Sequence, residues 1–421
     1  GGLAVGGLPD GTVDADTLAS NAVTSGKLAS GVGGKILQVK QFVKTDTFST
    51  NAYLTETDIG LQQTITPSSS DNKILITANI NYGGVGNNYA GIILRDNFRE
   101  ILKKYDNVLI FGEDAGKIGG VNQALEGLQE TFGEKRVFDT GIREATIIGQ
   151  GIGLSMRGLR PISEIQYLDY LLYSIQLLSD DLASLHYRTR GKQKAPLIVR
   201  TRGHRLEGIW HSGSLMGGMI NLLRGIFLLV PRNMTIAAGF YNMLLKGDQP
   251  AIVVECLNGY RKKERMPKNI GEFTIEIGKV EVIKEGDDIS VISYGSTLNI
   301  LTEVAKELEN FNISCEVIDC QSLIPFDIHN DILKSVKKTN KVLIIDEDFK
   351  YGASAYILDI LINRQNIYNY LDSKPSTLSA KEHRTPYGTD GDYFTKPSFD
   401  DIFKNIYKIM NESNPKKFPS V

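Results

Sequence analysis

The chain has 421 residues, of which 41% are hydrophobic and 23% are charged, and its formal net charge is −2. This composition is ordinary for a globular protein of roughly two to four domains. The small net charge excludes a general attraction to nucleic acid or to an anionic membrane. The longest purely apolar run, 226–230, is far too short to cross a bilayer.

The three cysteines, Cys256, Cys315 and Cys320, lie in apolar strand-like runs and lack the spacing of metal ligands. We therefore expect buried free thiols in a reducing compartment and no metal ligands in this chain. No signal-peptide pattern opens the sequence, so we expect a cytoplasmic protein.

Residues 1–95 are rich in Gly, Ser, Thr and Asn and carry few charges. The stretch 11–31 spaces small apolar residues among polar ones and cannot fill a core of its own, so it is either disordered or packs against other copies. Alternating β-branched residues predict strands at 36–45, 62–66 and 73–82. We expect 1–95 to form a small β-rich, low-complexity module.

From residue 97 the pattern changes to strand-like runs that alternate with helical windows, which is typical of a parallel α/β sheet. A charged, loop-like stretch at 261–268 separates two such series. The predicted strands are 108–111, 136–138, 197–200, 226–230 and 251–255, then 289–293, 315–318 and 341–345; the predicted helices are 96–104, 170–184, 213–223 and 236–245, then 298–309, 331–336 and 353–361. We therefore predict two three-layer α/β domains, at 96–270 and 277–421.

Glu144 is the leading candidate for chemistry. A short strand ends at Phe138, a Gly-containing corner follows, and a Gly-rich apolar helix then begins. Apolar neighbours disfavour ionisation of a carboxyl group, whereas the N–H groups and dipole of a helix N-terminus favour it. A group held between these influences suits proton exchange with a bound heterocycle, although a simple helix-stabilising charge has the same pattern. The glycines at 149, 151 and 153 indicate close helix packing rather than a dinucleotide site.

Seven segments of the α/β half, among them Val137-Phe-Asp-Thr-Gly-Ile-Arg-Glu144 and Trp210-His-Ser-Gly-Ser214, carry a resemblance to a known family. The others are 111–116, 158–170, 230–234, 315–319 and 345–348. Residues from about 97 to 421 resemble the β half of the thiamine-diphosphate-dependent 2-oxo acid dehydrogenases of the pyruvate and branched-chain complexes. The resemblance implies a pyrimidine-binding transketolase-like domain at 96–270 and a transketolase C-terminal-like domain at 277–421.

The resemblance also implies roles for single residues. Glu144 matches the catalytic glutamate that shares a proton with the aminopyrimidine ring of thiamine diphosphate, which is acid–base work done through the cofactor. Tyr170 matches an aromatic residue against that ring, Ile142 an apolar wall, and Glu113 an acidic position beside the pocket. His211 matches a catalytic residue at the substrate entrance. From the residues alone, Tyr170 is also consistent with a core aromatic, Glu113 with a turn cap and His211 with a surface residue.

One part of the family's cofactor site is missing. The Gly-Asp-Gly run that holds magnesium and the diphosphate does not occur in the sequence, and the stretch 388–392 is out of register and predicts a turn. The resemblance thus implies half a site, completed by an α subunit that carries the magnesium. Further implied partners are a second β copy, the lipoyl acyltransferase core and a small 2-oxo acid, with no nucleic acid and no membrane.

The function expected from the resemblance is oxidative decarboxylation of a branched-chain 2-oxo acid, or of pyruvate, with acyl transfer to a lipoyl group. We expect the chain to be inactive without an α partner. Segments 10–19 and 65–76, however, resemble phage tail-fibre sequence. The alternatives are therefore a fibre-like structural or adhesive protein, or a chimaeric fusion that carries an inactive enzyme half.

Overall fold

A computed structural model describes residues 40, 62–67, 69, 90–203, 211, 213–388 and 391–419. The chain divides into two compact units, Gly1–Gly83 and Gly84–Val421. In the first unit, residues 62–67 have no regular secondary structure, so the prediction of a strand at 62–66 was wrong. Alternation alone does not make a strand, because its N–H and C=O groups need a neighbouring strand to pair with. Apart from Lys40, the other two predicted strands lie outside the described residues.

Seven strands of the second unit form one sheet in the order β10-β5-β6-β4-β3-β1-β2. All neighbours are parallel except β10, which runs antiparallel to β5. The bounds are β1 Val108–Gly112, β2 Val137–Asp139, β3 Arg160–Ile165, β4 Ile198–Gly203, β5 Phe227–Leu229, β6 Ala251–Cys256 and β10 Ser322–Ile324. The prediction of a parallel α/β fold is confirmed.

Strand β3 was not predicted, and it lies in the interior of this sheet, between β4 and β1. Pro161 argues against a central strand, because proline cannot donate to a hydrogen-bond ladder. In the structure Pro161 is only the second residue of β3 and pairs with Leu109 of β1. Pairing with β4 begins one residue later, at Ile162. The proline therefore stands at the start of the strand, where the missing N–H is tolerated.

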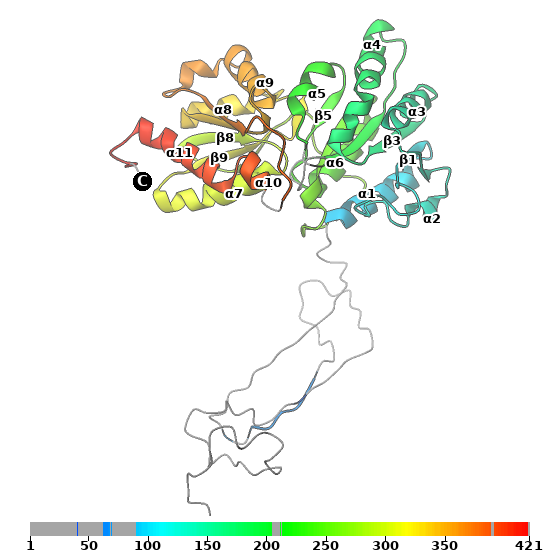
Figure 1. The fold of residues 1–421 in the computed structure, drawn as a ribbon, viewed down its shortest axis with the longest axis horizontal. Helices are drawn as coiled ribbons and strands as arrows, with labels where there is room; N and C mark the ends of the chain where they lie inside the picture. The colour runs from blue at the N-terminus through cyan, green and yellow to red at the C-terminus, as the bar shows by residue number, and fades with distance from the viewer. Residues whose placement is uncertain are drawn as a thin grey trace, which may run out of the picture. The chain divides into compact units, whose positions relative to one another are not determined.

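Helices cover both faces of the sheet (Figure 1). They are α1 Ala90–Lys104, α2 Leu128–Phe132, α3 Glu144–Met156, α4 Ser184–Arg188, α5 Met216–Leu222 and α6 Met234–Lys246. In α1 the apolar residues Leu94, Phe98, Ile101 and Leu102 recur at helical spacing and are buried. In α3 a Cβ at Gly151 would lie only 2.6 Å from Ser163 Oγ, so close packing against β3 requires glycine there.

The segment predicted as one helix at 170–184 is irregular. It consists of a 3-10 helix, η2 Leu168–Ser174, followed by a π-helix, η3 Leu177–Ala183, and then α4. A 3-10 helix has about three residues per turn, so side chains three apart share one face. Tyr167, which precedes η2, and Tyr170 are related in this way, and their ring centroids are 5.6 Å apart.

The second domain is built on a five-stranded sheet in the order β12-β11-β8-β9-β7, where β7 is antiparallel to β9. Its strands are β7 Glu281–Lys284, β8 Ile289–Ser293, β9 Cys315–Asp319, β11 Val342–Phe349 and β12 Ser376–Ala380. Its helices are α7 Thr297–Leu308, α8 Asp331–Thr339, α9 Ala353–Asp359, α10 Gly391–Thr395 and α11 Phe399–Ser413. Strands β7 and β12 and the last two helices were not predicted. Ser398 and Asp401 begin α11 with a reciprocal capping box.

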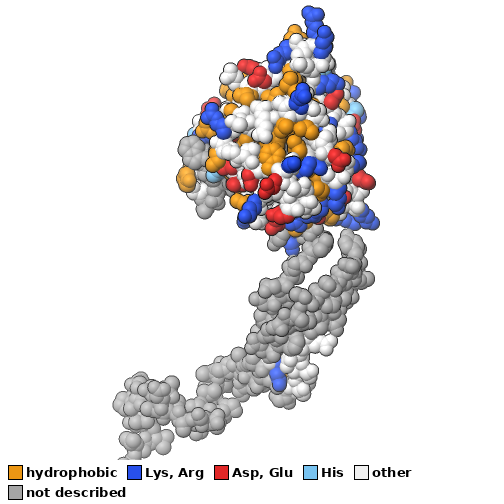
Figure 2. Space-filling view, turned by 90° about the vertical axis from the view of Figure 1, so that its right-hand side faces the viewer, with side chains coloured by type: hydrophobic (Ala, Val, Ile, Leu, Met, Phe, Trp, Pro, Cys, Tyr) orange, Lys and Arg blue, Asp and Glu red, His pale blue; other side chains and the backbone are white. Residues whose placement is uncertain are grey.

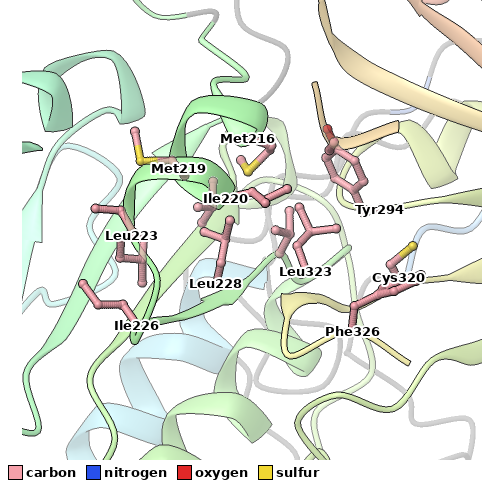
Figure 3. Close-up of a cluster of buried hydrophobic side chains, with 14 of the residues drawn as sticks. Met216, Met219, Ile220, Leu223, Ile226, Leu228, Tyr294, Cys320, Leu323 and Phe326 are labelled. Carbon is pink, nitrogen blue, oxygen red and sulfur yellow. The ribbon is translucent and has the colours of Figure 1, made fainter. Parts of the chain in front are cut away.

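The two α/β domains share a hydrophobic core. Figure 3 shows α5 and β5 side chains facing Tyr294, Leu323 and Phe326 of the second domain, and all belong to one buried cluster. Strand β10 joins the first sheet beside β5, which continues this contact through backbone hydrogen bonds. All three cysteines are buried and free, as predicted. Within the described ranges, no helix combines the length and apolarity needed to span a membrane.

Candidate active site

The candidate residues follow the carboxyl ends of four neighbouring parallel strands. Glu113 follows β1, Ile142 and Glu144 follow β2, Tyr170 follows β3, and His211 follows β4. These strands lie side by side in the order β4-β3-β1-β2. Carboxyl ends of parallel strands form the edge at which open α/β sheets bind ligands. The strand order therefore gathers residues that are far apart in the sequence.

The loops that carry Glu113 and Glu144 are tied to each other. The Thr140 N–H donates to the carbonyl of Gly112 at 3.0 Å, and the Asp139 carboxylate accepts the Gly116 N–H at 2.6 Å. Glu144 is the first residue of α3 and is half-buried, as the predicted helix start requires. Its carboxylate thus stands at a helix N-terminus, on a corner that two sets of hydrogen bonds hold in place.

A second carboxyl group lies near Glu144. Burial raises the pKa of Glu113, and the negative charges of Asp114 and Glu144 raise it further. The expectation that Glu144 has almost only apolar neighbours was therefore wrong. Its neighbours in sequence include the apolar Ile142 and Ala145 but also Arg143, and Glu113 comes from the end of the adjacent strand.

His211 is brought to Tyr170. The Tyr170 hydroxyl lies 3.1 Å from His211 Nε2, which is hydrogen-bonding distance, and the rings of Tyr167 and His211 have centroids 4.2 Å apart. Burial raises the pKa of Tyr170, and the charges of Tyr167, Asp169, Glu113 and Glu144 add to the effect. Tyr170 therefore contacts His211 and also lies within electrostatic reach of Glu113 and Glu144.

Ile142 differs from these four residues. Its side chain is 76% exposed, so within the single chain it does not form the inner wall of a closed pocket. Ile118 and Val121, in the loop after β1, are also exposed. Figure 2 shows apolar side chains gathered on one face of this unit, with acidic and basic side chains around them. Contiguous exposed apolar surface is typical of a surface that another molecule covers.

A buried ionic network lies on the strands below these loops, and we did not predict it from the sequence. Arg200 donates to Glu164 and, at 2.9 Å, to Glu255, while Arg202 donates to Glu164 at 2.9 Å. Tyr260 donates to Glu255. Burial opposes ionisation of Glu164, but Arg202 and Arg200 outweigh it and lower the pKa of this carboxyl. The network links β3, β4 and β6 through paired charges.

Two residues beside the site were missed. The Tyr167 ring packs against the His211 ring at a tilt of 49°, and the Asp169 carboxylate accepts the Gly213 N–H at 2.7 Å. Both follow β3, the strand that was not predicted, so neither was placed at a strand end. The usable signal was weak: only Ile162 and Ile165 are β-branched in the four residues of β3 that follow Pro161, and Ser163 and Glu164 between them are polar.

Comparison with known proteins identifies the family. Residues 92–262 match the family described as "Transketolase, pyrimidine binding domain", and residues 278–394 match "Transketolase, C-terminal domain". The pyruvate dehydrogenase E1 component subunit beta of Bacillus subtilis (strain 168) is 32% identical over 322 residues, which cover 75% of this chain and 97% of that protein. The chain belongs to the family of 2-oxo acid dehydrogenase β subunits.

Other relatives agree with this assignment. The 2-oxoisovalerate dehydrogenase subunit beta of the same organism is 34% identical over 287 residues, which cover 68% of this chain and 86% of that β subunit. A solved split-gene transketolase, described as an inactive beta4 tetramer, superimposes with a TM-score of 0.59 at 16% identity and covers 77% of this chain and 99% of its own. That structure supports the fold alone. The resemblance of residues 97–421 to β subunits of this family is confirmed.

Proposed function

We propose that the chain is the β half of a 2-oxo acid dehydrogenase that works with an α partner and thiamine diphosphate. The proposed reaction is oxidative decarboxylation of a branched-chain 2-oxo acid, with pyruvate as the second choice, and acyl transfer to a lipoyl group. The observation that carries the proposal is the grouping of Glu144, Glu113, Tyr170 and His211 at the carboxyl edge of the sheet, in a chain of this family.

The residues present fit the pyrimidine end of thiamine diphosphate. A ring nitrogen needs a carboxyl group that can hold or release a proton, and Glu144 is half-buried at a helix N-terminus. The ring faces need apolar or aromatic cover. The half-buried Tyr170 follows β3, and the exposed Ile142 lies on the same corner after β2 as Glu144. When bound, the cofactor supplies the carbon nucleophile and the electron sink for loss of carbon dioxide.

The chain's own residues then have separate tasks. Glu144 is placed to hold a proton at the pyrimidine ring, and beside it burial and the charges of Asp114 and Glu144 raise the pKa of Glu113. His211, at 3.1 Å from the Tyr170 hydroxyl, is placed to move a proton at the substrate side. We assign the diphosphate and its magnesium to the α partner, because the sequence has no Gly-Asp-Gly run.

The exposed apolar side chains near the site support a partner that covers them. Ile142, Ile118 and Val121 are 76%, 57% and 39% exposed in the single chain. Burying such side chains is favourable by about 25 cal/mol per Å² of apolar area. An α subunit on this surface would enclose the cofactor between the two chains and exclude water from it. A second β copy and the lipoyl acyltransferase core complete the proposed assembly.

The test is reconstitution. The chain is purified alone and together with an α subunit from a 2-oxo acid dehydrogenase. Decarboxylation of 3-methyl-2-oxobutanoate and of pyruvate is followed with thiamine diphosphate, Mg²⁺ and an oxidised lipoyl group as the two-electron acceptor and acyl acceptor. The proposal expects turnover only with the α subunit, and a higher kcat/KM for the branched-chain acid. Turnover by the chain alone would contradict the half-site, and no turnover with any α subunit would contradict the activity.

A further inference from the structure

Two consecutive residues of η2 each bind one residue of the segment that follows β4. The Tyr170 hydroxyl lies 3.1 Å from His211 Nε2, and Asp169 Oδ2 accepts the Gly213 backbone N–H at 2.7 Å. His211 and Gly213 are two residues apart in the sequence. Two neighbouring side chains therefore hold the imidazole itself and the backbone two residues after it.

The second oxygen of Asp169 belongs to a contact with the other domain. Arg384, which lies between β12 and α10, places Nη1 at 2.8 Å from Asp169 Oδ1. The Asp169 side chain is 8% exposed and that of Arg384 is 49% exposed, so the cation covers a nearly buried acid. A charge-assisted hydrogen bond at each oxygen fixes both the place and the orientation of the carboxylate.

The backbone of Gly213 packs so closely against this carboxylate that it leaves no room for a Cβ. A Cβ at Gly213 would lie 2.5–2.7 Å from the carboxyl atoms of Asp169, closer than real Cβ contacts allow. Glycine thus permits the backbone N–H to reach the acid. Gly213 and Arg384 also line the same cavity between the two domains. The contact is therefore a close three-part junction of η2, the segment after β4 and the C-terminal domain.

We propose that Asp169 is a positioning residue for His211, and that Arg384, from the C-terminal domain, holds the Asp169 carboxylate in the orientation that this role requires. The inference rests on the proposed function, because it concerns how His211 is presented to the substrate. Asp169 acts through Gly213 rather than on the reacting atoms. Its loss therefore moves the imidazole away from Tyr170 while leaving the imidazole itself intact.

The test uses the full chain and two variants. Asp169→Asn keeps the size of the side chain and removes its charge, and Arg384→Gln removes the cation at a half-exposed position. Arg364→Gln, an exposed arginine of the same domain in η6 Ile360–Arg364, is the matched control. Hydrogen exchange of the peptide that contains Gly213 is measured by mass spectrometry. The ¹³Cε1 resonance of His211 is assigned with His211→Gln and followed by NMR.

We expect exchange at Gly213 to accelerate about tenfold or more in both variants, since a charge-assisted hydrogen bond is lost or weakened. The His211 resonance moves in both variants, and Arg384→Lys restores much of the shift. The control changes neither quantity. In the complex with an α subunit, kcat falls about tenfold in both variants, with a smaller change in KM for the 2-oxo acid.

If Asp169→Asn leaves the Gly213 exchange and the His211 resonance unchanged, the positioning role is overturned. If only Arg384→Gln leaves them unchanged, the part played by the C-terminal domain is overturned. Both measurements work without cofactor or partner. They therefore decide this inference even where reconstitution gives no turnover, a result that would count against the proposed function alone.

Discussion

Replacing Arg200 with methionine removes the cation that pairs with two buried carboxylates, Glu164 and Glu255. All three side chains are 0% exposed, and Arg200 contacts Glu255 at 2.9 Å. Removing one partner of a buried ion pair costs about 3–5 kcal/mol, because the remaining charge is left without compensation. Arg202 still binds Glu164, and Tyr260 still donates to Glu255, so we expect the lower end, about 3 kcal/mol.

Thermal and urea unfolding at neutral pH measure this loss. A change of 1 kcal/mol moves Tm by about 2–4 °C in a domain of this size, so Arg200→Met lowers Tm by about 10 °C. Arg188→Met is the control, because its ion pair with Asp181 spans 4.0 Å and is more than half exposed, and we expect no measurable shift. Adding Glu255→Met to Arg200→Met restores part of the stability. Equal Tm values for the two single variants would refute the account of the network.

Two further predictions concern packing and pH. Gly151→Ala destabilises the chain by about 1–3 kcal/mol, since the new Cβ would lie 2.6 Å from Ser163 Oγ. Gly153→Ala is the control: its Cβ meets nothing within 4 Å, so we expect it to be neutral or stabilising. Urea unfolding measures the free energy of unfolding of both variants, and equal losses would contradict the packing account. Burial raises the pKa of Asp348 to about 6. Between about pH 4 and pH 6 the folded chain therefore keeps a proton on this carboxyl, whereas the unfolded chain has released it. The free energy of unfolding thus falls as pH rises through that window. Asp348→Asn keeps an acceptor for the Gly217 N–H at 2.7 Å and flattens this fall, measured as unfolding free energy against pH; an unchanged slope would count against the buried acid.

The elements that were predictable are those with a continuous local signal. Strands β1, β6 and β8 are short runs that are mostly apolar, and α3 begins at Glu144, where the corner after β2 ends. Strand β3 was not predicted because Pro161 argues against a strand. The irregular η2 and η3 were predicted as one α-helix, because their apolar pattern also suits an α-helix. In both cases tertiary packing, not local preference, selected the backbone conformation.

Sequence reasoning could name single residues of the candidate site, but it could not predict how they are arranged in space. Glu144 and Tyr170 could be named from their segments, but the approach of Glu113 to Glu144 depends on β1 lying beside β2 in the sheet. The pair Asp169 and Arg384 joins positions 215 residues apart. Contacts of this kind follow from strand order and domain packing, which no local pattern encodes.

The most direct test of the central claim is decarboxylation by Glu144→Gln in complex with an α subunit. Glutamine keeps the shape of the side chain and cannot exchange a proton, so we expect kcat to fall about 100- to 10,000-fold. Glu130→Gln, which also removes an acid from the first turn of a helix, α2, is the control and should retain full activity. Undiminished decarboxylation by Glu144→Gln would contradict the assignment of this carboxyl group to the chemistry.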